Sequence, residues 1–338
     1  MAISIKDIAR LAGVSHSTVS RALRNSPLIP AQTAHRIQKI AQEAGYTASA
    51  VARSLVTKKT HAIGVVVTSI ADPFNGEVVA GIEEFANEHG YSVILANSQA
   101  DPEREVTMVR SFQERRVDGI LVASSRVGAL YVPLLSELGI PIVLLNNQHP
   151  SEFVHSVMID DASGGYEATR HLITLGHKRI AYVGDQFGLH SDVERHAGYK
   201  RALMEADLPV LKSLVVHGDG KPEGGRQAAQ QLLGQQDGPT GIFCYNDMSA
   251  LGVLEEIAAK GLSVPEDISV VGFDDIFFAA LLQPPLTTVR QPKKEMGRRA
   301  MRLLLALLRG EEAQKTITIK GELVVRRSTG KAKTRPSR

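Results

Sequence analysis

The chain has 338 residues, of which 43% are hydrophobic and 22% are charged, a composition typical of folded soluble proteins and a length that predicts two or three domains. No apolar run approaches the ~18 residues of a membrane span, no secretory signal is visible, and the single cysteine excludes an internal disulfide or a cysteine-rich metal site, so a cytoplasmic location is expected. The net charge is only +3, but residues 1–60 hold nine Lys or Arg against two acidic residues, a local charge of +7 that favours a polyanionic partner, with a basic solvated surface as the alternative.

The N-terminal segment has the pattern of three short helices. Apolar residues recur at helical spacing over residues 5–12, 16–23 and 31–44. Gly13 would end the first helix and Ser15 would cap the second, whereas the third lacks a good side-chain cap and should have a frayed first turn. Two helices joined by a short turn with a glycine, and completed by a third, form the helix-turn-helix plan.

Residues 47–60 have helix-forming residues but no apolar face of their own. A helix this short is marginal in isolation. We therefore expect a linker that becomes ordered only when it has a partner.

From residue 62 the pattern changes to apolar runs that alternate with helical segments. This alternation predicts parallel sheets with helices on both faces, and the repeats are too many for one typical sheet. We expect an α/β body of two doubly wound parallel-sheet lobes, with a ligand at the carboxyl ends of the strands, between the lobes. The expected strands are 62–67, 92–96, 119–123, 141–145, 179–184, 241–245 and 269–273, and the expected helices are 75–89, 102–116, 163–175, 194–206, 223–234 and 247–260.

An ordered series of motifs runs along almost the whole chain. The N-terminal motifs are "IKDIARLAGVSHSTVSRAL", "AHRIQKIAQEAGY" and "SAVARSL". The body contributes "IGVVVTSIADPFNGEVVAGIE", "RVDGILV", "LGHKRIAYVG", "RHAGYKRAL", "FCYNDMSALG", "GLSVPEDISVVGFDD" and "PLTTVRQP". In these motifs and their order the chain resembles the lactose repressor (LacI/GalR) family of bacterial transcription regulators.

The resemblance implies a sequence-specific regulator, most often a repressor. Such a protein binds a near-palindromic double-stranded DNA operator as a homodimer, and a small effector between the two lobes of its periplasmic-binding-protein-like body controls it allosterically. The tail lacks the leucine heptad that the tetrameric member of the family uses, so a dimer is expected. The implied domains are a helix-turn-helix domain over 1–47, a hinge helix over 48–60, an N-terminal lobe over 61–161 and 291–321, a C-terminal lobe over 162–290 and 322–330, and a disordered tail over 331–338.

The second helix of the family's DNA-binding domain enters the major groove of DNA. The positions that match His16, Ser17 and Arg21 read bases there, and an arginine can donate two hydrogen bonds to one guanine. A solvated surface charge is the alternative for Arg21, and a local helix cap is the alternative for Ser15. The remaining polar residues are expected to contact the DNA backbone, which positions the domain without specifying sequence. They are Lys6, Ser15, Thr18, Ser20, Arg24 and Asn25.

The motif "SAVARSL" matches the family's hinge helix, which pairs with its dimer mate in the minor groove. Leu55 corresponds to a leucine that wedges between the central base pairs and kinks the duplex, a type of contact that unstacks one base step. Ser49, Ala52 and Arg53 would line the same groove. Packing of Leu55 on the body of the protein is the alternative.

The resemblance also implies a set of effector-binding residues in the cleft. They are Phe74, Asn75, Asn146, Asn147, Ser191, Arg195, Asn246 and Asp274. The Arg, Asp and Asn side chains supply the planar donor and acceptor pairs that suit a polyhydroxylated ligand. Gly220 stands where the family often has a stacking aromatic residue, which disfavours a flat purine. We therefore expect a sugar, a sugar acid or a sugar phosphate.

Several acidic residues have structural alternatives. Asp274 could be an ordinary helix cap, and Asp247 is expected to cap a helix and not to contact the ligand. Asp160 and Asp161 could each cap a helix or reach the cleft.

Two other classes of protein are disfavoured. No dinucleotide-binding, phosphate-binding or nucleophile-elbow motif is present, and the histidines do not cluster at metal-binding spacing. We therefore expect no enzymatic activity, no cofactor and no metal, and Cys244 should be buried and inert. An exported binding protein would share the body, but the basic N-terminal module and the missing signal argue against it.

Overall fold

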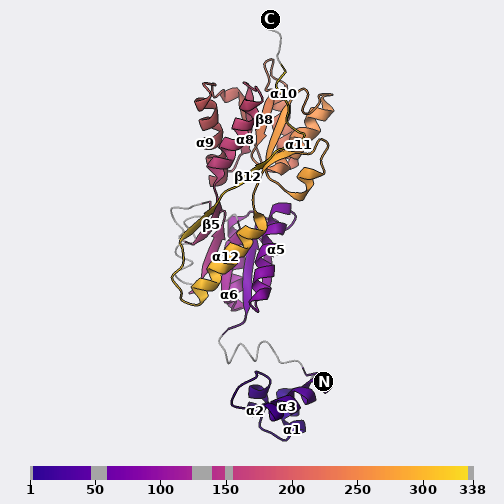
Figure 1. The fold of residues 1–338 in the computed structure, drawn as a ribbon, viewed down its shortest axis with the longest axis vertical. Coiled ribbons are helices and arrows are strands. Elements are labelled where there is room, and N and C mark those ends of the chain that lie inside the picture. The colour runs from indigo at the N-terminus through magenta and orange to yellow at the C-terminus, as the bar shows by residue number, and fades with distance from the viewer. Residues whose placement is uncertain (1–2, 47–58, 124–138, 149–154, 334–338) are drawn as a thin grey trace. The chain divides into compact units, whose positions relative to one another are not determined.

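The computed structural model describes residues 3–46, 59–123, 139–148 and 155–333. They fall into two compact units, one within residues 1–60 and one from residue 61 onward, and Figure 1 traces the chain through both. The predicted hinge residues lie outside the described residues: Ser49, Ala52, Arg53 and Leu55.

The N-terminal unit consists of three helices, as predicted. They are α1 (Ile5–Ala12), α2 (His16–Ala22) and α3 (Ala31–Glu43). Ser4 caps α1 in a reciprocal capping box with Asp7, Gly13 ends α1 at a φ of 64°, and the Ser15 hydroxyl caps α2. The start of α3 has no side-chain cap bond, as expected. Apolar side chains of all three helices form a small core: Ile8, Ala9, Ala12, Val19, Ala22, Ile37 and Ala41.

The second unit contains two six-stranded sheets, one in each of two lobes. The strands are β1 (Ala62–Val67), β2 (Ser92–Asn97), β3 (Gly119–Ala123), β4 (Ile142–Leu145), β5 (Ser156–Ile159), β6 (Ile180–Asp185), β7 (Val215–Gly218), β8 (Gly241–Cys244), β9 (Ser269–Asp274), β10 (Thr287–Arg290), β11 (Thr316–Ile319) and β12 (Glu322–Val324). The first sheet has the order β11-β5-β4-β3-β1-β2, and the second has the order β12-β10-β9-β8-β6-β7. Neighbouring strands are parallel except β12, which runs antiparallel to β10. The predicted doubly wound α/β body is thus confirmed.

Helices cover both faces of each sheet. They are α5 (Pro73–Glu88), α6 (Pro102–Glu114), α8 (Asp161–Thr174), α9 (His190–Glu205), α10 (Pro222–Leu233), α11 (Asp247–Ala259) and α12 (Lys293–Leu308). In the first lobe, α5 and α12 pack on one face and α6 on the other. In the second lobe, α8 and α9 pack on one face and α10 and α11 on the other. Strands buried on both faces explain the continuous apolar runs in the sequence.

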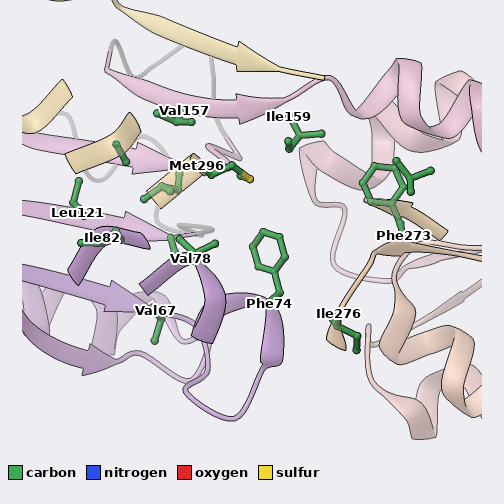
Figure 2. Close-up of a cluster of buried hydrophobic side chains, with 14 of the residues drawn as sticks. Val67, Phe74, Val78, Ile82, Leu121, Val157, Ile159, Phe273, Ile276 and Met296 are labelled. Atoms are coloured by element: carbon green, nitrogen blue, oxygen red, sulfur yellow. The ribbon is translucent and has the colours of Figure 1, made fainter. Parts of the chain in front are cut away.

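The chain crosses between the lobes three times. The crossings join β5 to α8, β10 to α12, and β11 to β12, and Figure 1 shows them between the two sheets. Apolar packing continues from one lobe to the other near these crossings. Figure 2 shows Phe74, Val78 and Ile159 of the first lobe in the same buried cluster as Phe273 and Ile276 of the second.

Three pairs of helices cross at glycines: α5 with α12, α8 with α9, and α10 with α11. At each of these glycines an added Cβ would overlap the backbone of the partner helix. The pairs are Gly81 with Gly297, Gly165 with Gly198, and Gly225 with Gly252. The helix backbones therefore approach more closely than any side chain would allow.

The C-terminal segment differs from the predicted disordered tail, which was placed from residue 331 onward. The Ala332 N–H donates to the Leu175 carbonyl at 2.9 Å, and the Lys333 ammonium contacts Asp267 at 2.7 Å. Residues 331–333 are therefore ordered against the second lobe, because their backbone and charge find partners there. The rest of the predicted tail lies outside the described residues.

Candidate functional site

The second helix of the N-terminal unit presents the residues predicted to read bases. His16, Ser17 and Arg21 are all exposed, while Val19 and Ala22 face the core of the unit. Neither the Arg21 guanidinium nor the His16 ring makes a hydrogen bond or ion pair with any described residue. A surface arginine without a partner keeps its donors free for an incoming acceptor.

The hydroxyl groups near the start of α2 form a small network. The Ser15 Oγ lies 2.8 Å from the Ser17 Oγ and 2.9 Å from the Thr18 Oγ1, and it also accepts the Thr18 N–H at 3.2 Å. The last of these bonds satisfies one of the free N–H groups of the helix start. Both interpretations of Ser15 therefore remain compatible, because its hydroxyl caps the helix and is still exposed.

The residues predicted to contact the DNA backbone differ in their surroundings. Lys6 is exposed, whereas Thr18 and Ser20 are half-buried. The Arg24 guanidinium donates to the Ser20 carbonyl and hydroxyl, each at 3.0 Å. Asn25 has a positive φ of 54°, and its side-chain Oδ1 accepts from the Gln38 side-chain amide at 2.7 Å. Asn25 thus has a structural task in the turn after α2, which sequence reasoning did not foresee.

A cleft lies between the lobes, at the carboxyl ends of the parallel strands. It consists of an inner chamber of about 70 Å³ and an outer chamber of about 600 Å³, which share five lining residues. Seven of the eight predicted effector-binding residues line the inner chamber: Phe74, Asn75, Asn146, Ser191, Arg195, Asn246 and Asp274. The eighth, Asn147, is buried but is not among the lining residues of the inner chamber.

Arg195 is the buried cation of the inner chamber. Its Nε donates to the Asp161 carboxylate at 2.8 Å, and its Nη1 donates to the Tyr245 carbonyl at 2.6 Å. The guanidinium carbon lies 3.6 Å from the centre of the Phe273 ring. These contacts fix the plane of the guanidinium, and they leave Nη2 without a hydrogen-bond partner among the described residues.

Asp160 and Asp161 occupy the first crossing between the lobes, and the structure separates their roles. The Asp160 carboxylate caps α8 by accepting the Ser163 N–H at 3.0 Å. Asp161 is buried in the ion pair with Arg195. Neither carboxylate lines the cleft, so Asp161 positions Arg195 and does not contact the cavity itself.

Asp274 lies at the end of β9, where the chain takes an unusual conformation. Its φ is 114°, a region that residues with a side chain rarely adopt. Its carboxylate accepts from the Gln291 amide at 2.7 Å and lies 3.8 Å from the Arg195 guanidinium. Burial raises the pKa of Asp274 to about 7; the nearby Arg195 opposes the shift, whereas Asp72 adds to it.

Two residues that line the inner chamber each carry a buried amide oxygen that has no hydrogen-bond partner among the described residues. These atoms are the Asn146 Oδ1 and the Gln291 Oε1. Buried polar atoms in native proteins are nearly always hydrogen-bonded. An unpaired acceptor of this kind is stabilised by any donor that reaches it, from the protein or from a ligand.

Other lining residues already bond to the protein and shape the wall of the chamber. The Asn75 amide donates to the Ser69 carbonyl at 2.9 Å. The Asn246 side-chain Oδ1 caps α11 by accepting the Ser249 N–H at 2.8 Å, and its Nδ2 donates to the Gly220 backbone carbonyl at 2.9 Å. The side chains of Asn75 and Asn246 therefore contribute shape more than free hydrogen-bonding groups.

The predicted helix cap at Asp247 is wrong, because Asn246 caps α11 instead. The Asp247 carboxylate is buried, where it accepts the Thr288 hydroxyl at 2.6 Å and the Ile276 N–H at 2.9 Å. It thereby ties α11 to β10 and to the loop after β9. Burial and the neighbouring Asp274 raise the pKa of Asp247 well above its ordinary value.

Sequence reasoning missed several lining residues: Thr68, Asp72, Gln148, Leu189, Tyr245 and Gln291. Asp72 caps α5 through the Phe74 N–H at 3.0 Å and borders both chambers. The Gln148 side-chain Oε1 accepts the Ser191 backbone N–H at 3.3 Å, a bond that joins the two lobes. The sequence offered a signal for Asp72, since an Asp-Pro pair begins many helices; nothing marked the glutamines.

Gly220 borders the outer chamber, and no aromatic ring stands in its place. Its φ is 75°, and an added Cβ would find its nearest atoms only at 3.6 and 3.9 Å, on Asn246 and Tyr245. The wall here is therefore open. Phe74 lines the inner chamber from the first lobe.

The described residues contain no group of three His, Cys, Asp or Glu side chains that could hold a metal ion. Within the same part of the chain, no helix is long and apolar enough to cross a membrane. Cys244 is buried, as expected, and burial raises the pKa of its thiol far above the ordinary value. Such a thiol is unreactive at neutral pH.

Two family models match the chain. The model for bacterial regulatory proteins of the lacI family matches residues 4–49, and the model for a periplasmic binding protein-like domain matches residues 169–329. The first match covers the three-helix unit and the second covers most of the C-terminal lobe.

Curated and solved relatives are similar over most of the chain. The HTH-type transcriptional repressor PurR of Vibrio atlanticus is 37% identical over 329 residues, which are 97% of this chain and 98% of that protein. The lac repressor dimer bound to operator and the anti-inducer ONPF superposes with a TM-score of 0.90 at 28% identity, covering 98% of this chain and 100% of that one. A LacI family regulator from Enterococcus faecium with bound ribose has a TM-score of 0.74 at 31% identity, covering 80% of this chain and 100% of that one.

Proposed function

Since the chain belongs to the lacI family of bacterial transcription regulators and is a repressor by that membership, we propose that it acts as a homodimer on a near-palindromic operator and responds to a small effector in the cleft between its lobes. In this proposal residues 1–47 recognise DNA and residues 48–60 form the hinge. Residues 61–330 form the two-lobed effector domain, and the protein acts where the operator is, in the cytoplasm.

DNA recognition in this proposal is divided between two sets of side chains. His16, Ser17 and Arg21 read base edges in the major groove, with Arg21 donating to guanine. The exposed and unpaired state of Arg21 supports this role. The backbone-contacting set neutralises or hydrogen-bonds phosphates: Lys6, Ser15, Thr18, Ser20, Arg24 and Asn25.

The hinge is proposed to order on the operator. Leu55 inserts as a wedge in the minor groove, with Ser49, Ala52 and Arg53 beside it. The weak helix-forming pattern of this segment supports the idea that it needs a partner to fold.

An exposed apolar patch on the C-terminal lobe is proposed to belong to the dimer face. It consists of Phe277 and Phe278 in η3 (Phe277–Ala280) together with Leu281, which are 57%, 42% and 69% exposed. Two neighbouring phenylalanines in solvent are unusual for a monomer, and such patches commonly mark protein interfaces.

The effector is proposed to be a sugar or a compact polyhydroxylated sugar derivative. The observation that carries this proposal is the lining of the inner chamber, which brings together Arg195, Asp274, Asn146 and Gln291. Asn146 and Gln291 each carry an amide oxygen that has no hydrogen-bond partner among the described residues. Hydroxyl groups can donate to the oxygens and accept from the guanidinium at once. The ribose-bound relative supports the same class, and Gly220 itself supplies no ring on which a flat base could stack.

The experiment is a coupled titration on the intact protein. Neutral aldoses, disaccharides and purine bases are tested for thermal stabilisation, and any compound that binds is then tested for its effect on operator affinity by fluorescence anisotropy. We expect a sugar to bind and to change operator affinity at least about fivefold, with the operator changing sugar affinity by the same factor.

A variant links this coupling to the cleft. Gln291→Leu removes the unpaired oxygen and should weaken sugar binding about tenfold, the cost of one lost hydrogen bond. Gln227→Leu, on the exposed surface of α10, serves as the control. Binding of a purine base but of no sugar would overturn the proposed ligand class. A sugar that binds without any effect on operator affinity would overturn the proposed regulation.

A further inference from the structure

Carboxylates dominate the charged lining of the cleft. Asp72 enters it from the first lobe and Asp274 from the second, and both border the inner chamber. Asp185, at the end of β6, and Asp219, after β7, border the outer chamber. The only cations among the described lining residues of the two chambers are Arg195 and Lys221.

The positive charge of Arg195 is already balanced by the protein. Its guanidinium forms a buried ion pair with Asp161 at 2.8 Å and lies 3.8 Å from Asp274. Two carboxylates thus face one guanidinium in a buried setting. The buried Lys293 lies nearby, but its ammonium donates to the Asp274 and Asp275 carbonyls and lies 3.4 Å from the Glu77 carboxylate. An anionic ligand would therefore add a negative charge next to cations that already have partners, and an uncompensated buried charge is costly.

The second cation cannot take the place of Arg195 as a partner for an anion. Lys221 is exposed, so water screens its charge. Asp219 is directly beside it and accepts the Lys221 backbone N–H at 3.0 Å. The described lining of the outer chamber therefore holds one solvated ammonium against three carboxylates, those of Asp72, Asp185 and Asp219.

We propose that the effector carries no anionic group and presents hydroxyl or ammonium donors that bridge Asp72 of the first lobe to Asp274 of the second. This inference rests on the effector function proposed above and narrows its ligand class by excluding sugar phosphates and sugar acids.

The electrostatics of the two carboxylates fit this assignment. Burial raises the pKa of Asp72 and raises that of Asp274, with Asp72 adding to the effect on Asp274. A carboxylate whose ionisation is disfavoured by burial and by a second carboxylate is stabilised by donors placed between the two. Because one carboxylate belongs to each lobe, the same donors would hold the lobes together around the ligand.

The experiment compares derivatives of one sugar at pH 7. For the aldose that binds most tightly, affinities are measured by calorimetry for the neutral sugar, its 2-amino-2-deoxy derivative, its phosphate ester and its uronic acid. We expect the phosphate and the uronate to bind at least about tenfold more weakly than the neutral sugar. The amino sugar should bind at least as tightly as the neutral one.

A matched pair of variants tests the role of Asp72. Asp72→Asn keeps the helix cap and removes the charge, so the penalty against the uronate should shrink by about tenfold. Asp101→Asn is the control, because Asp101 likewise caps a helix before a proline, at the start of α6, and is not among the described lining residues of either chamber. The control should discriminate against the uronate as the wild type does.

The outcomes separate this inference from the function on which it rests. A phosphate or uronate that binds more tightly than the neutral sugar overturns the inference and leaves the sugar effector intact. An unchanged penalty in Asp72→Asn also overturns it. If purine bases bind and sugars do not, the sugar class falls, and the inference is then tested by base against nucleoside monophosphate, where a tighter monophosphate overturns it.

Discussion

Neighbouring side chains of the same type have different tasks in this molecule. Asp160 caps a helix, whereas Asp161 holds the buried guanidinium of Arg195. Asn246 caps α11, and Asp247 beside it ties α11 to the second sheet. These assignments depend on which groups the fold places within 3 Å, so residue type alone left the alternatives open.

The candidate cleft could be predicted only in part from the sequence. The family motifs carried Arg195 on α9 and the lining residues at strand ends, such as Asn146 and Asp274. Strand ends are marked by the apolar runs before them. Gln148 and Gln291 could not be foreseen. Their positions at the cleft depend on how closely the two lobes approach, which no local pattern encodes.

Asp274 predicts a specific pH dependence of stability. Its pKa is about 7 in the folded protein and ~3.9 in the unfolded chain, so the folded state binds more protons between these values and loses stability as the pH rises from ~4 to 7. Asp274→Asn removes this loss. Its stability relative to wild type should rise between pH 5 and pH 7 by up to about 1.4 kcal/mol per pH unit and then level off.

Urea unfolding at pH 5, 6, 7 and 8 measures this difference. Asp101→Asn, whose parent carboxylate is exposed at the start of α6, should follow the wild type at every pH. A constant offset between Asp274→Asn and wild type across the range would contradict the raised pKa.

Arg21 and Arg24 should affect operator binding in different ways. Arg21→Ala removes the proposed base contact, so binding to the operator should weaken by about 1–3 kcal/mol and preference at one base pair should relax. Arg24→Ala removes the proposed phosphate contact, so binding should weaken evenly across sequences and the salt slope should fall by about one. Selection from a randomised operator pool, at two salt concentrations, measures both effects; identical profiles for the two variants would count against the assignment.

At the scale of elements, close helix crossings organise the two lobes. Each of the three glycine pairs lets one helix backbone contact another, and each pair covers one face of a sheet. The α8 and α9 crossing also sets the position of Arg195, since the Arg195 carbonyl is the atom that a Cβ at Gly165 would meet.

Sequence patterns predicted most of these elements but not all of the strands. The expected strands with continuous apolar runs are all present, as β1, β2, β3, β4, β6, β8 and β9. The patterns missed β5, β7, β10, β11 and β12, which are three or four residues long. Several of these carry threonine or histidine, and β7, β11 and β12 lie at sheet edges, where burial and its apolar pattern are weaker.

The glycine crossings predict opposite outcomes for two similar substitutions. Gly252→Ala would drive a methyl group into the Pro222 carbonyl of α10 and should destabilise the protein by about 1–3 kcal/mol. Gly76→Ala in α5 meets open space and should stabilise the protein by up to about 1 kcal/mol. Thermal or urea unfolding of both variants tests the pair, and equal effects would refute the close-crossing argument.

At the scale of the whole molecule, a basic DNA-binding unit is attached to a body of ordinary surface charge. Operator binding should therefore weaken steeply between ~50 and 200 mM salt, because each phosphate that is neutralised releases counterions. A near-palindromic operator further requires two copies of the unit in a fixed relation, which the proposed dimer supplies.

The dimer proposal has its own test. Leu281→Asp places a charge in the exposed apolar patch on and after η3 and should shift the protein toward monomer in sedimentation experiments, with a parallel loss of operator affinity. Val325→Asp, exposed on the same lobe but outside the patch, is the control. A dimer of unchanged strength in Leu281→Asp would place the interface elsewhere.

The three crossings between the lobes have a consequence for how such proteins can recombine. Neither lobe is a continuous stretch of chain. A single exchange of gene segments within the body therefore combines, in one lobe, segments from two different proteins that did not evolve to pack together. The three-helix unit, by contrast, is separated from the body at one junction near residue 60. A new operator preference can therefore be transferred by one exchange of gene segments at this junction. A new effector preference requires exchange of the entire body or individual substitutions within the cleft.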